Sequence, residues 1–176
     1  MCLQSYRKVI LKNNHYYCHK EYTCFYKNGL LSSIASGGVA IYVDSSYQAK
    51  QIPLQTRLEA IAIEMTLKQS FSICNIYLLP STIFSLEELE NTYQQPPHSC
   101  IIVGDFNSHN IIWGCITRSP KVTIVEDFVG STNMVLLNTG QATRIRLRSR
   151  ILWPLFSPYI QLEPLLISIW KWSLAN

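Results

Sequence analysis

The polar residues of segment 104–109, Gly-Asp-Phe-Asn-Ser-His, are the strongest candidates for chemistry in this chain. The carboxylate of Asp105 could orient or deprotonate a water molecule, and the amide of Asn107 could donate to a phosphate oxygen. If the chain stays extended here, the two side chains point the same way, because alternate residues of a strand share a face. His109 adds a group that can move protons or contact phosphate near neutral pH. The residues alone leave a second interpretation open, in which Asp105 and Asn107 cap backbone groups of a polar turn.

A short apolar run, residues 100–103, comes directly before this segment and must position it. Uninterrupted apolar runs of this kind are typical of strands that are buried on both faces. Such a strand delivers its last residues to the edge of the sheet, where a ligand can reach them. Gly104 would let the chain turn there without steric cost. The sequence therefore predicts a rigidly placed carboxylate at the end of an interior strand.

Three further runs have the alternation and composition of strands: residues 39–43, 58–67 and 71–77. The last two are separated by a short polar break, which predicts an antiparallel hairpin. A second helix over 122–129 and a strand over 134–137 follow later in the chain. With the helix described next, this order predicts the α/β class, a sandwich in which helices cover β-sheets.

A capping box opens the first predicted helix. Ser85 can accept from the backbone three residues on, and Glu88 can reach back to the backbone of Ser85. The helix runs toward Tyr93 and stops before Pro96 and Pro97, because proline cannot continue a helix.

The composition is that of a globular protein. The chain has 176 residues, of which 48% are hydrophobic and 15% charged, which fits one domain and excludes a disordered chain. A formal net charge of +4 is compatible with a polyanionic partner but does not demand one. The six cysteines include no Cys-x-x-Cys pair, and Cys74 and Cys100 lie in apolar runs. Buried, reduced thiols are therefore expected, which favours an intracellular compartment.

The C-terminal part of the chain differs from the rest. Segment 144–150 holds four arginines, and the apolar, aromatic segment 151–172 follows it. Three prolines and Glu163 interrupt the second segment, so we do not expect a membrane span, which needs about 20 mostly apolar residues. We expect a loosely ordered end, of the kind that a shift of reading frame would produce.

The ordered set of motifs resembles the endonuclease/exonuclease/phosphatase family. The Gly-Asp-Phe-Asn-Ser-His core, followed by Trp113-Gly114, is most similar to endonuclease domains of jockey-type non-LTR retrotransposons. Other stretches agree in order with the strands and the late segment of that family: 37–43, 58–61, 75–77, 135–138 and 142–144. The resemblance covers roughly residues 1 to 144. It implies two packed β-sheets flanked by helices in a four-layer sandwich, with residues 145–176 as an aberrant tail.

The resemblance also implies a reaction and a set of roles. The reaction is Mg²⁺-dependent (or Mn²⁺-dependent) hydrolysis of a DNA phosphodiester, which primes reverse transcription. Asp105 would activate water, Asn107 and Tyr77 would hold a phosphate oxygen, and His109 would be an accessory phosphate contact. Asp105 and Asn107 would also lie at the metal. Arg144 and Asn75 would contact DNA.

The expected partners are DNA and a parent polyprotein that carries a reverse transcriptase. No membrane is expected as a partner, and a functional protein would act in the nucleus.

The sequence departs from the family pattern at both ends. The first strand of the family would precede Met1, and Ser5-Tyr6 stand where a glutamate, the principal magnesium ligand, and a threonine are usual. A serine hydroxyl is a poor ligand for a hard cation. Nothing after Arg144 matches the closing Ser-Asp-His triplet. We therefore expect an incomplete sandwich with unpaired edges and little or no activity. A non-catalytic DNA-binding remnant and a phosphatase-like enzyme of the same fold remain as alternatives.

Overall fold

The structure is a computed structural model. It describes residues 2–5, 21–28, 38–97, 99–109, 119–132, 134–137, 145–147, 150–152 and 166–169. For segments 2–5, 145–147, 150–152 and 166–169 the description covers the backbone.

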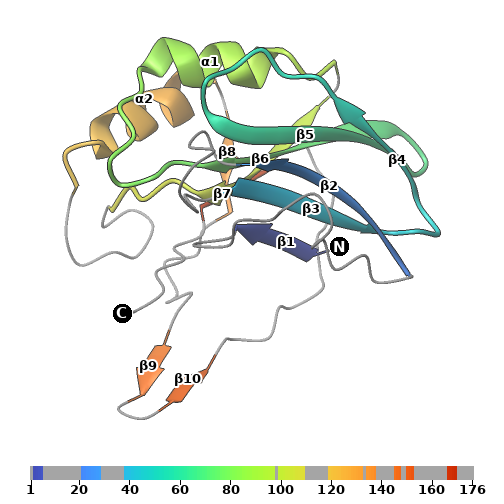
Figure 1. Ribbon diagram of the computed structural model, residues 1–176. Helices are drawn as coiled ribbons and strands as arrows, with labels where there is room; N and C mark the ends of the chain where they lie inside the picture. The colour runs from blue at the N-terminus through green and yellow to red at the C-terminus, as the bar shows by residue number, and fades with distance from the viewer. Residues whose placement is uncertain are drawn as a thin grey trace.

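A six-stranded mixed sheet is the centre of the fold (Figure 1). Its strand order is β4-β5-β6-β7-β11-β8. The strands are β4 (Gln48–Ile52), β5 (Glu59–Thr66), β6 (Ser70–Tyr77), β7 (Cys100–Asp105), β8 (Val135–Leu136) and β11 (Leu166–Ile169). Strands β4, β5 and β6 pair antiparallel, and β6, β7, β11 and β8 pair parallel. The predicted hairpin of β5 and β6 is confirmed.

A three-stranded antiparallel sheet packs against this central sheet. Its order is β1-β3-β2, from β1 (Cys2–Ser5), β2 (Tyr22–Asn28) and β3 (Gly38–Asp44). A separate two-stranded hairpin joins β9 (Ile145–Leu147) to β10 (Arg150–Leu152). The expected α/β sandwich of two packed sheets is therefore confirmed.

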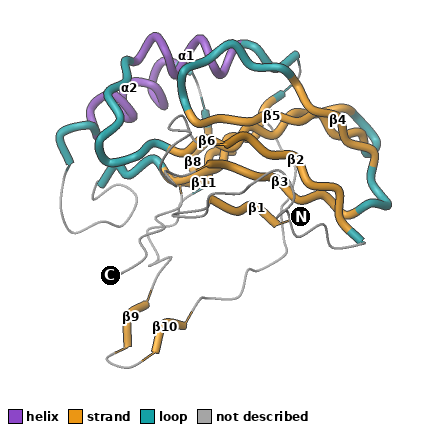
Figure 2. The backbone as a smooth tube through the Cα atoms, in the orientation of Figure 1, coloured by secondary structure: helices purple, strands orange, loops and turns teal. Residues whose placement is uncertain are grey.

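Two helices lie over the other face of the central sheet (Figure 2): α1 (Leu86–Gln94) and α2 (Val122–Ser131). Helix α1 begins as the sequence predicts, because the Ser85 hydroxyl accepts from the Glu88 amide and Glu88 accepts from the Ser85 amide. Arg57 donates to the same Glu88 carboxylate at 2.6 Å and joins α1 to the start of β5. Within the described residues, helices cover only this face, so helices on the outer face of the smaller sheet remain an expectation. Neither described helix is long and apolar enough to span a membrane.

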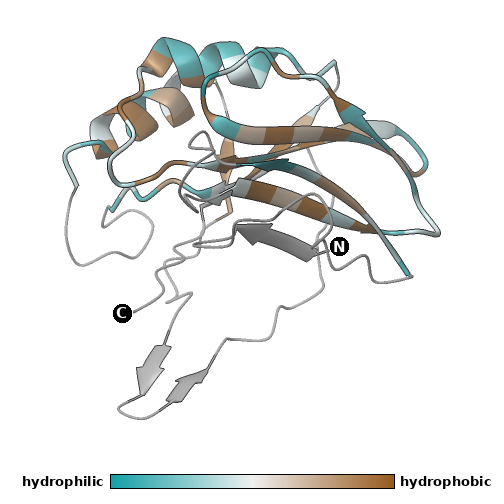
Figure 3. Cartoon of the chain, in the orientation of Figure 1, coloured by the Kyte–Doolittle hydropathy of each residue, from teal (hydrophilic) through white to brown (hydrophobic). Residues whose placement is uncertain are grey.

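Two apolar cores fill the spaces between these three layers, and hydrophobic colour runs along β3 and β5 in Figure 3. One core joins the helices to the central sheet, and the other joins the two sheets. Strand β7 contributes Ile102 to the first core and Val103 to the second, which confirms that it is buried on both faces.

The central sheet contains two strands that the sequence did not predict, β4 and β11. Strand β11 comes from the segment expected to be aberrant, and it pairs with β7 on one side and β8 on the other. Strand β7 therefore has a partner along both edges. The division of the chain at residues 144 and 145 stays a prediction.

Candidate functional site

The site begins where two parallel strands end side by side. Strands β6 and β7 pair so that Tyr77 lies opposite Asp105 at their carboxyl ends. Both residues are buried, with 5% and 1% of their surface exposed. Opposed positions on neighbouring strands share a face, and Tyr77 belongs to the core between the two sheets. The structure therefore brings together two of the predicted catalytic residues on the face that meets the smaller sheet.

Glu59 is a third member of this row, and the sequence reasoning assigned it no role. It lies opposite Tyr77 on β5 and is 3% exposed. One carboxylate oxygen accepts a hydrogen bond from the backbone N–H of Gly38 at 3.0 Å. The sequence did hold a signal: Glu59 is an acidic residue within an apolar run, and a buried charge must be compensated.

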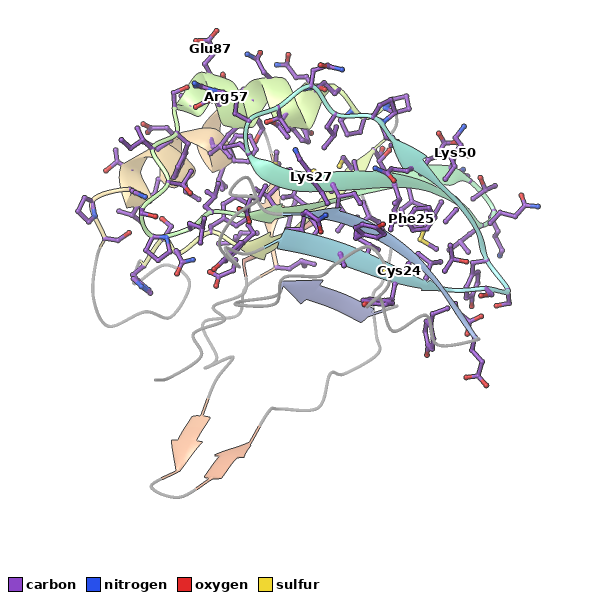
Figure 4. All side chains as sticks on the ribbon, in the orientation of Figure 1. Cys24, Phe25, Lys27, Lys50, Arg57 and Glu87 are labelled. Atoms are coloured by element: carbon purple, nitrogen blue, oxygen red, sulfur yellow. The ribbon has the colours of Figure 1, made fainter. Side chains whose placement is uncertain are left out.

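Polar bonds join the two sheets at this end of the sandwich. Lys27 of β2, labelled in Figure 4, donates to the carbonyl oxygen of Leu58 at 3.0 Å, just before β5. Burial lowers the pKa of Lys27, and the charge of the Glu59 carboxylate acts in the opposite direction. The side-chain amide of Asn75 donates to the carbonyl oxygen of Ala40 at 3.1 Å. These bonds cross an interface whose core is formed mainly by apolar side chains.

Asn75 was predicted to contact DNA. It is 3% exposed, and its amide nitrogen bonds the backbone of the smaller sheet as described above. The structure thus gives this side chain an internal contact, and a contact with DNA stays a prediction.

Gly104 is required by the backbone at the end of β7. Its φ of +141° lies in a region that residues with a side chain rarely adopt. A Cβ atom here would lie 1.8 Å from the carbonyl oxygen of Ile76 on β6. The glycine predicted to permit a turn also permits the close approach of the two strands that carry Tyr77 and Asp105.

Asn107 corrects one expectation. Its φ of +44° places it in the left-handed region, so the chain does not stay extended after Asp105. A carboxylate oxygen of Asp105 accepts from the backbone N–H of Asn107 at 2.9 Å, and this bond bends the chain. The side-chain nitrogen of Asn107 then donates to the carbonyl oxygen of Leu78 at 2.8 Å. These two bonds agree with the alternative interpretation of the sequence, in which Asp105 and Asn107 cap backbone groups of a polar turn.

The loop after Asn107 is anchored by a pair of bonds. The backbone N–H of His109 donates to the hydroxyl of Ser119 at 3.1 Å, and the N–H of Ser119 donates to the carbonyl of His109 at 3.0 Å. His109 is partly exposed, which suits an accessory contact with a ligand. It follows Asp105 by four residues, on the loop that begins where β7 ends.

Ser5, where the metal ligand of the family was expected, is described by its backbone alone. Ser5 ends β1, with its backbone opposite Val39 of β3, and β1 comes into contact with β7. The strand that carries Ser5 therefore lies near the strand that carries Asp105. Arg144 and the Trp113-Gly114 pair lie outside the described residues.

Residues 71–152 match the endonuclease-reverse transcriptase family. The matched stretch is just under half of the chain and contains Tyr77, Asp105, Asn107 and His109. This match supports the endonuclease family and suggests an endonuclease-like domain. No curated protein and no solved structure gives a significant match.

The family is typically dependent on a divalent metal, but the side chains described here do not fit a metal centre. Within the described ranges, no group of three or more His, Cys, Asp and Glu residues is placed to hold a metal ion. One oxygen of Asp105 is engaged by the backbone of Asn107, and the amide nitrogen of Asn107 is engaged by Leu78. A hard cation prefers several carboxylate, carbonyl and water oxygens, and this set supplies few of them.

Proposed function

We propose that this chain is an endonuclease-like domain of retrotransposon origin, related to the jockey type. Its ancestor would have cut DNA phosphodiester bonds with Mg²⁺ and left a 3′-hydroxyl that primes reverse transcription. The observation that carries the proposal is the meeting of Tyr77 and Asp105 at the ends of two parallel strands, with Asn107 bonded to the same strand ends. The family match over residues 71–152 supports it independently.

The roles of the site residues follow from their chemistry. Asp105 would orient the attacking water, while Tyr77 and Asn107 would hold a phosphate oxygen of the backbone. His109 would contact an adjacent phosphate. Asn75 and Arg144 would add contacts with DNA. A phosphate contact fixes where the backbone lies but carries no sequence information.

We further propose that hydrolysis by this chain is weak or absent. By the resemblance, Ser5 stands where a metal-binding glutamate is usual, and no group of described side chains is placed to hold a metal ion. Loss of one stabilising donor at a reacting centre typically costs roughly 10²–10³ in rate. A bound divalent metal would supply electrostatic stabilisation of the charge that develops on the phosphate.

The partners we propose are DNA and a longer parent protein with a reverse transcriptase. The place of action would be intracellular, in the nucleus for a functional protein. The free thiols of Cys74 and Cys100 are compatible with a reducing compartment.

Nicking of supercoiled plasmid in Mg²⁺ or Mn²⁺ tests the catalytic part of the proposal. The matched control is Asp105→Asn, which keeps an acceptor for the Asn107 amide and removes the charge. We expect equal, background nicking by both proteins, each shown by circular dichroism to be folded. Nicking by the wild type that disappears in the control would show that other residues complete the metal site.

DNA binding and ester hydrolysis separate the two alternatives. A non-catalytic DNA-binding remnant is supported by the formal charge of +4, and its affinity must fall as salt rises. Binding that is absent or independent of salt would count against it. A phosphatase-like enzyme of the same fold would hydrolyse a small phosphate ester faster than DNA.

A further inference from the structure

Ile83 is the most exposed large apolar side chain in the described part of the molecule. It is 94% exposed, whereas the others of this class range from 38% to 52%. The next residue, Phe84, is 5% exposed and belongs to the core beneath the helices. A single exposed isoleucine is not unusual by itself. Ile83 differs from other exposed apolar residues in two ways: hydrogen bonds hold its loop in place, and the loop begins at the candidate site.

The loop that carries Ile83 is held on both sides. The backbone N–H of Thr82 donates to the carbonyl of Leu79 at 2.9 Å, which closes a turn. The ammonium group of Lys121 donates to the carbonyl of Pro80 at 2.6 Å and also to the carbonyls of Leu79 and Thr82. The same group lies 5.6 Å from the centre of the Phe84 ring. Ile83 is therefore fixed between a bonded turn and a buried side chain.

This loop begins at the candidate site. It follows Tyr77 directly, and its first residue, Leu78, donates its N–H to the carbonyl of Asp105 at 2.9 Å. The Leu78 carbonyl accepts from Asn107. A phosphate held by Tyr77 and Asn107 would therefore lie beside the loop.

The chemistry of the loop suits a polyanion with an apolar interior. Residues 79–84 include no charged side chain, so the loop does not repel phosphate. The positively charged ammonium group of Lys121 is bonded to carbonyl oxygens of the loop. Stacked bases between two phosphate backbones are such a partner.

We infer that Ile83 is a wedge that enters DNA beside the candidate site and separates two stacked bases. Apolar side chains of proteins that bend DNA insert in this way. Because the loop is held before binding, little conformational freedom is lost when the wedge enters. This inference rests on the proposed function, since it requires that the site binds DNA.

A fluorescent duplex tests the inference with the whole chain. The probe is a short DNA duplex with one 2-aminopurine, a base whose fluorescence rises when it is unstacked, in a buffer containing EDTA. The variant is Ile83→Ala. The matched control is Leu67→Ala, which removes an apolar side chain that is 46% exposed in the turn between β5 and β6, at the opposite end of these strands.

We expect the wild type to bind and to raise the fluorescence. Ile83→Ala should weaken binding about tenfold, because a buried aliphatic side chain contributes that much or more. It should also abolish the fluorescence rise and leave the salt dependence of binding unchanged, since no phosphate contact is removed. Leu67→Ala should behave as the wild type, and all three proteins should unfold at the same denaturant concentration.

Each other result overturns the inference in a distinguishable way. Equal binding and fluorescence for wild type and Ile83→Ala would reject the wedge and leave DNA binding by the domain intact. A wild type that binds no DNA would reject the wedge together with the DNA-binding part of the proposed function. Self-association of the wild type that Ile83→Ala removes in sedimentation velocity, without a change in DNA affinity, would assign Ile83 to a protein contact.

Discussion

Replacing Gly104 by alanine should destabilise the fold severely. The added Cβ would lie 1.8 Å from the Ile76 carbonyl oxygen and 2.8 Å from its carbonyl carbon, both of which belong to the backbone of β6. Real Cβ atoms keep at least about 3 Å from such atoms, so the two strands would have to separate by about 1 Å. A φ of +141° adds strain, which typically costs 1–3 kcal/mol for a residue with a side chain.

The two effects together predict a loss of about 3–5 kcal/mol in the free energy of unfolding. Natural domains have about 5–15 kcal/mol in total, so the variant should be close to its limit of stability. Urea denaturation followed by circular dichroism measures the change. Because β6 and β7 part where Tyr77 and Asp105 meet, any DNA binding at the site should be lost as well.

Gly130→Ala provides the matched control for this substitution. Apart from its chain neighbours and the nearby backbone of the helix, no described atom lies within 4 Å of a Cβ placed there, and the residue is in the last turn of α2. Alanine is preferred to glycine within helices by roughly 0.8–1.0 kcal/mol, so this variant should be unchanged or slightly more stable. A Gly104→Ala protein within about 1 kcal/mol of the wild type would refute the reasoning, because it would mean that the strands do not approach as described.

Three other substitutions and conditions test separate parts of the structure. Ser85→Ala should cost about 1 kcal/mol in urea denaturation, because it removes the side-chain cap of α1, and an unchanged midpoint would contradict the capping box. Glu59→Ala should cost about 1–3 kcal/mol, because it leaves the buried N–H of Gly38 without its acceptor; Glu59→Gln, which retains an acceptor, should cost less, and the reverse order would be inconsistent with the bond. Burial raises the pKa of Cys100 from 9.0 to about 12, so the folded state keeps a proton that the unfolded state releases. Stability should therefore fall between about pH 9 and pH 12, with a slope of about 1.4 kcal/mol per pH unit from this thiol, and Cys100→Ala should flatten the slope measured by urea denaturation.

The interior strands were predictable because the apolar pattern of their own sequences is enough to identify them. The run 100–103 and the alternating residues of 71–77 are apolar at the positions that the two cores require. Helix α1 was predictable from its cap and the prolines after it. Strand β4 was missed because Gln48–Ile52 is a largely polar, exposed edge strand. No local sequence pattern indicates that it pairs with β5.

The site was predictable as a set of residue types, but its local geometry was not. The segment from Gly104 to Asn107 identifies the strand end. Asp105 lies at the carboxyl end of β7 as predicted, whereas Asn107 does not continue the extended chain. The left-handed turn at Asn107 depends on a hydrogen bond that the Asp105 carboxylate accepts from the Asn107 N–H. It also depends on the carbonyl of Leu78, which follows β6 and is distant in sequence. Glu59 was missed as part of the site for a similar reason, because its partner Gly38 is on the other sheet.

The position of β11 in the central sheet sets an order of events when the chain is made. The residues that flank it, Cys100–Asp105 on one side and Val135–Leu136 on the other, are synthesised before Leu166–Ile169. Pairing between β7 and β8 before then would close the gap that β11 must enter. A chain leaving the ribosome at about 5–20 residues per second would keep one edge of β7 open for seconds. The nascent protein thus depends on a late insertion, and a chaperone that shields that edge would be expected to raise the yield of folded molecules.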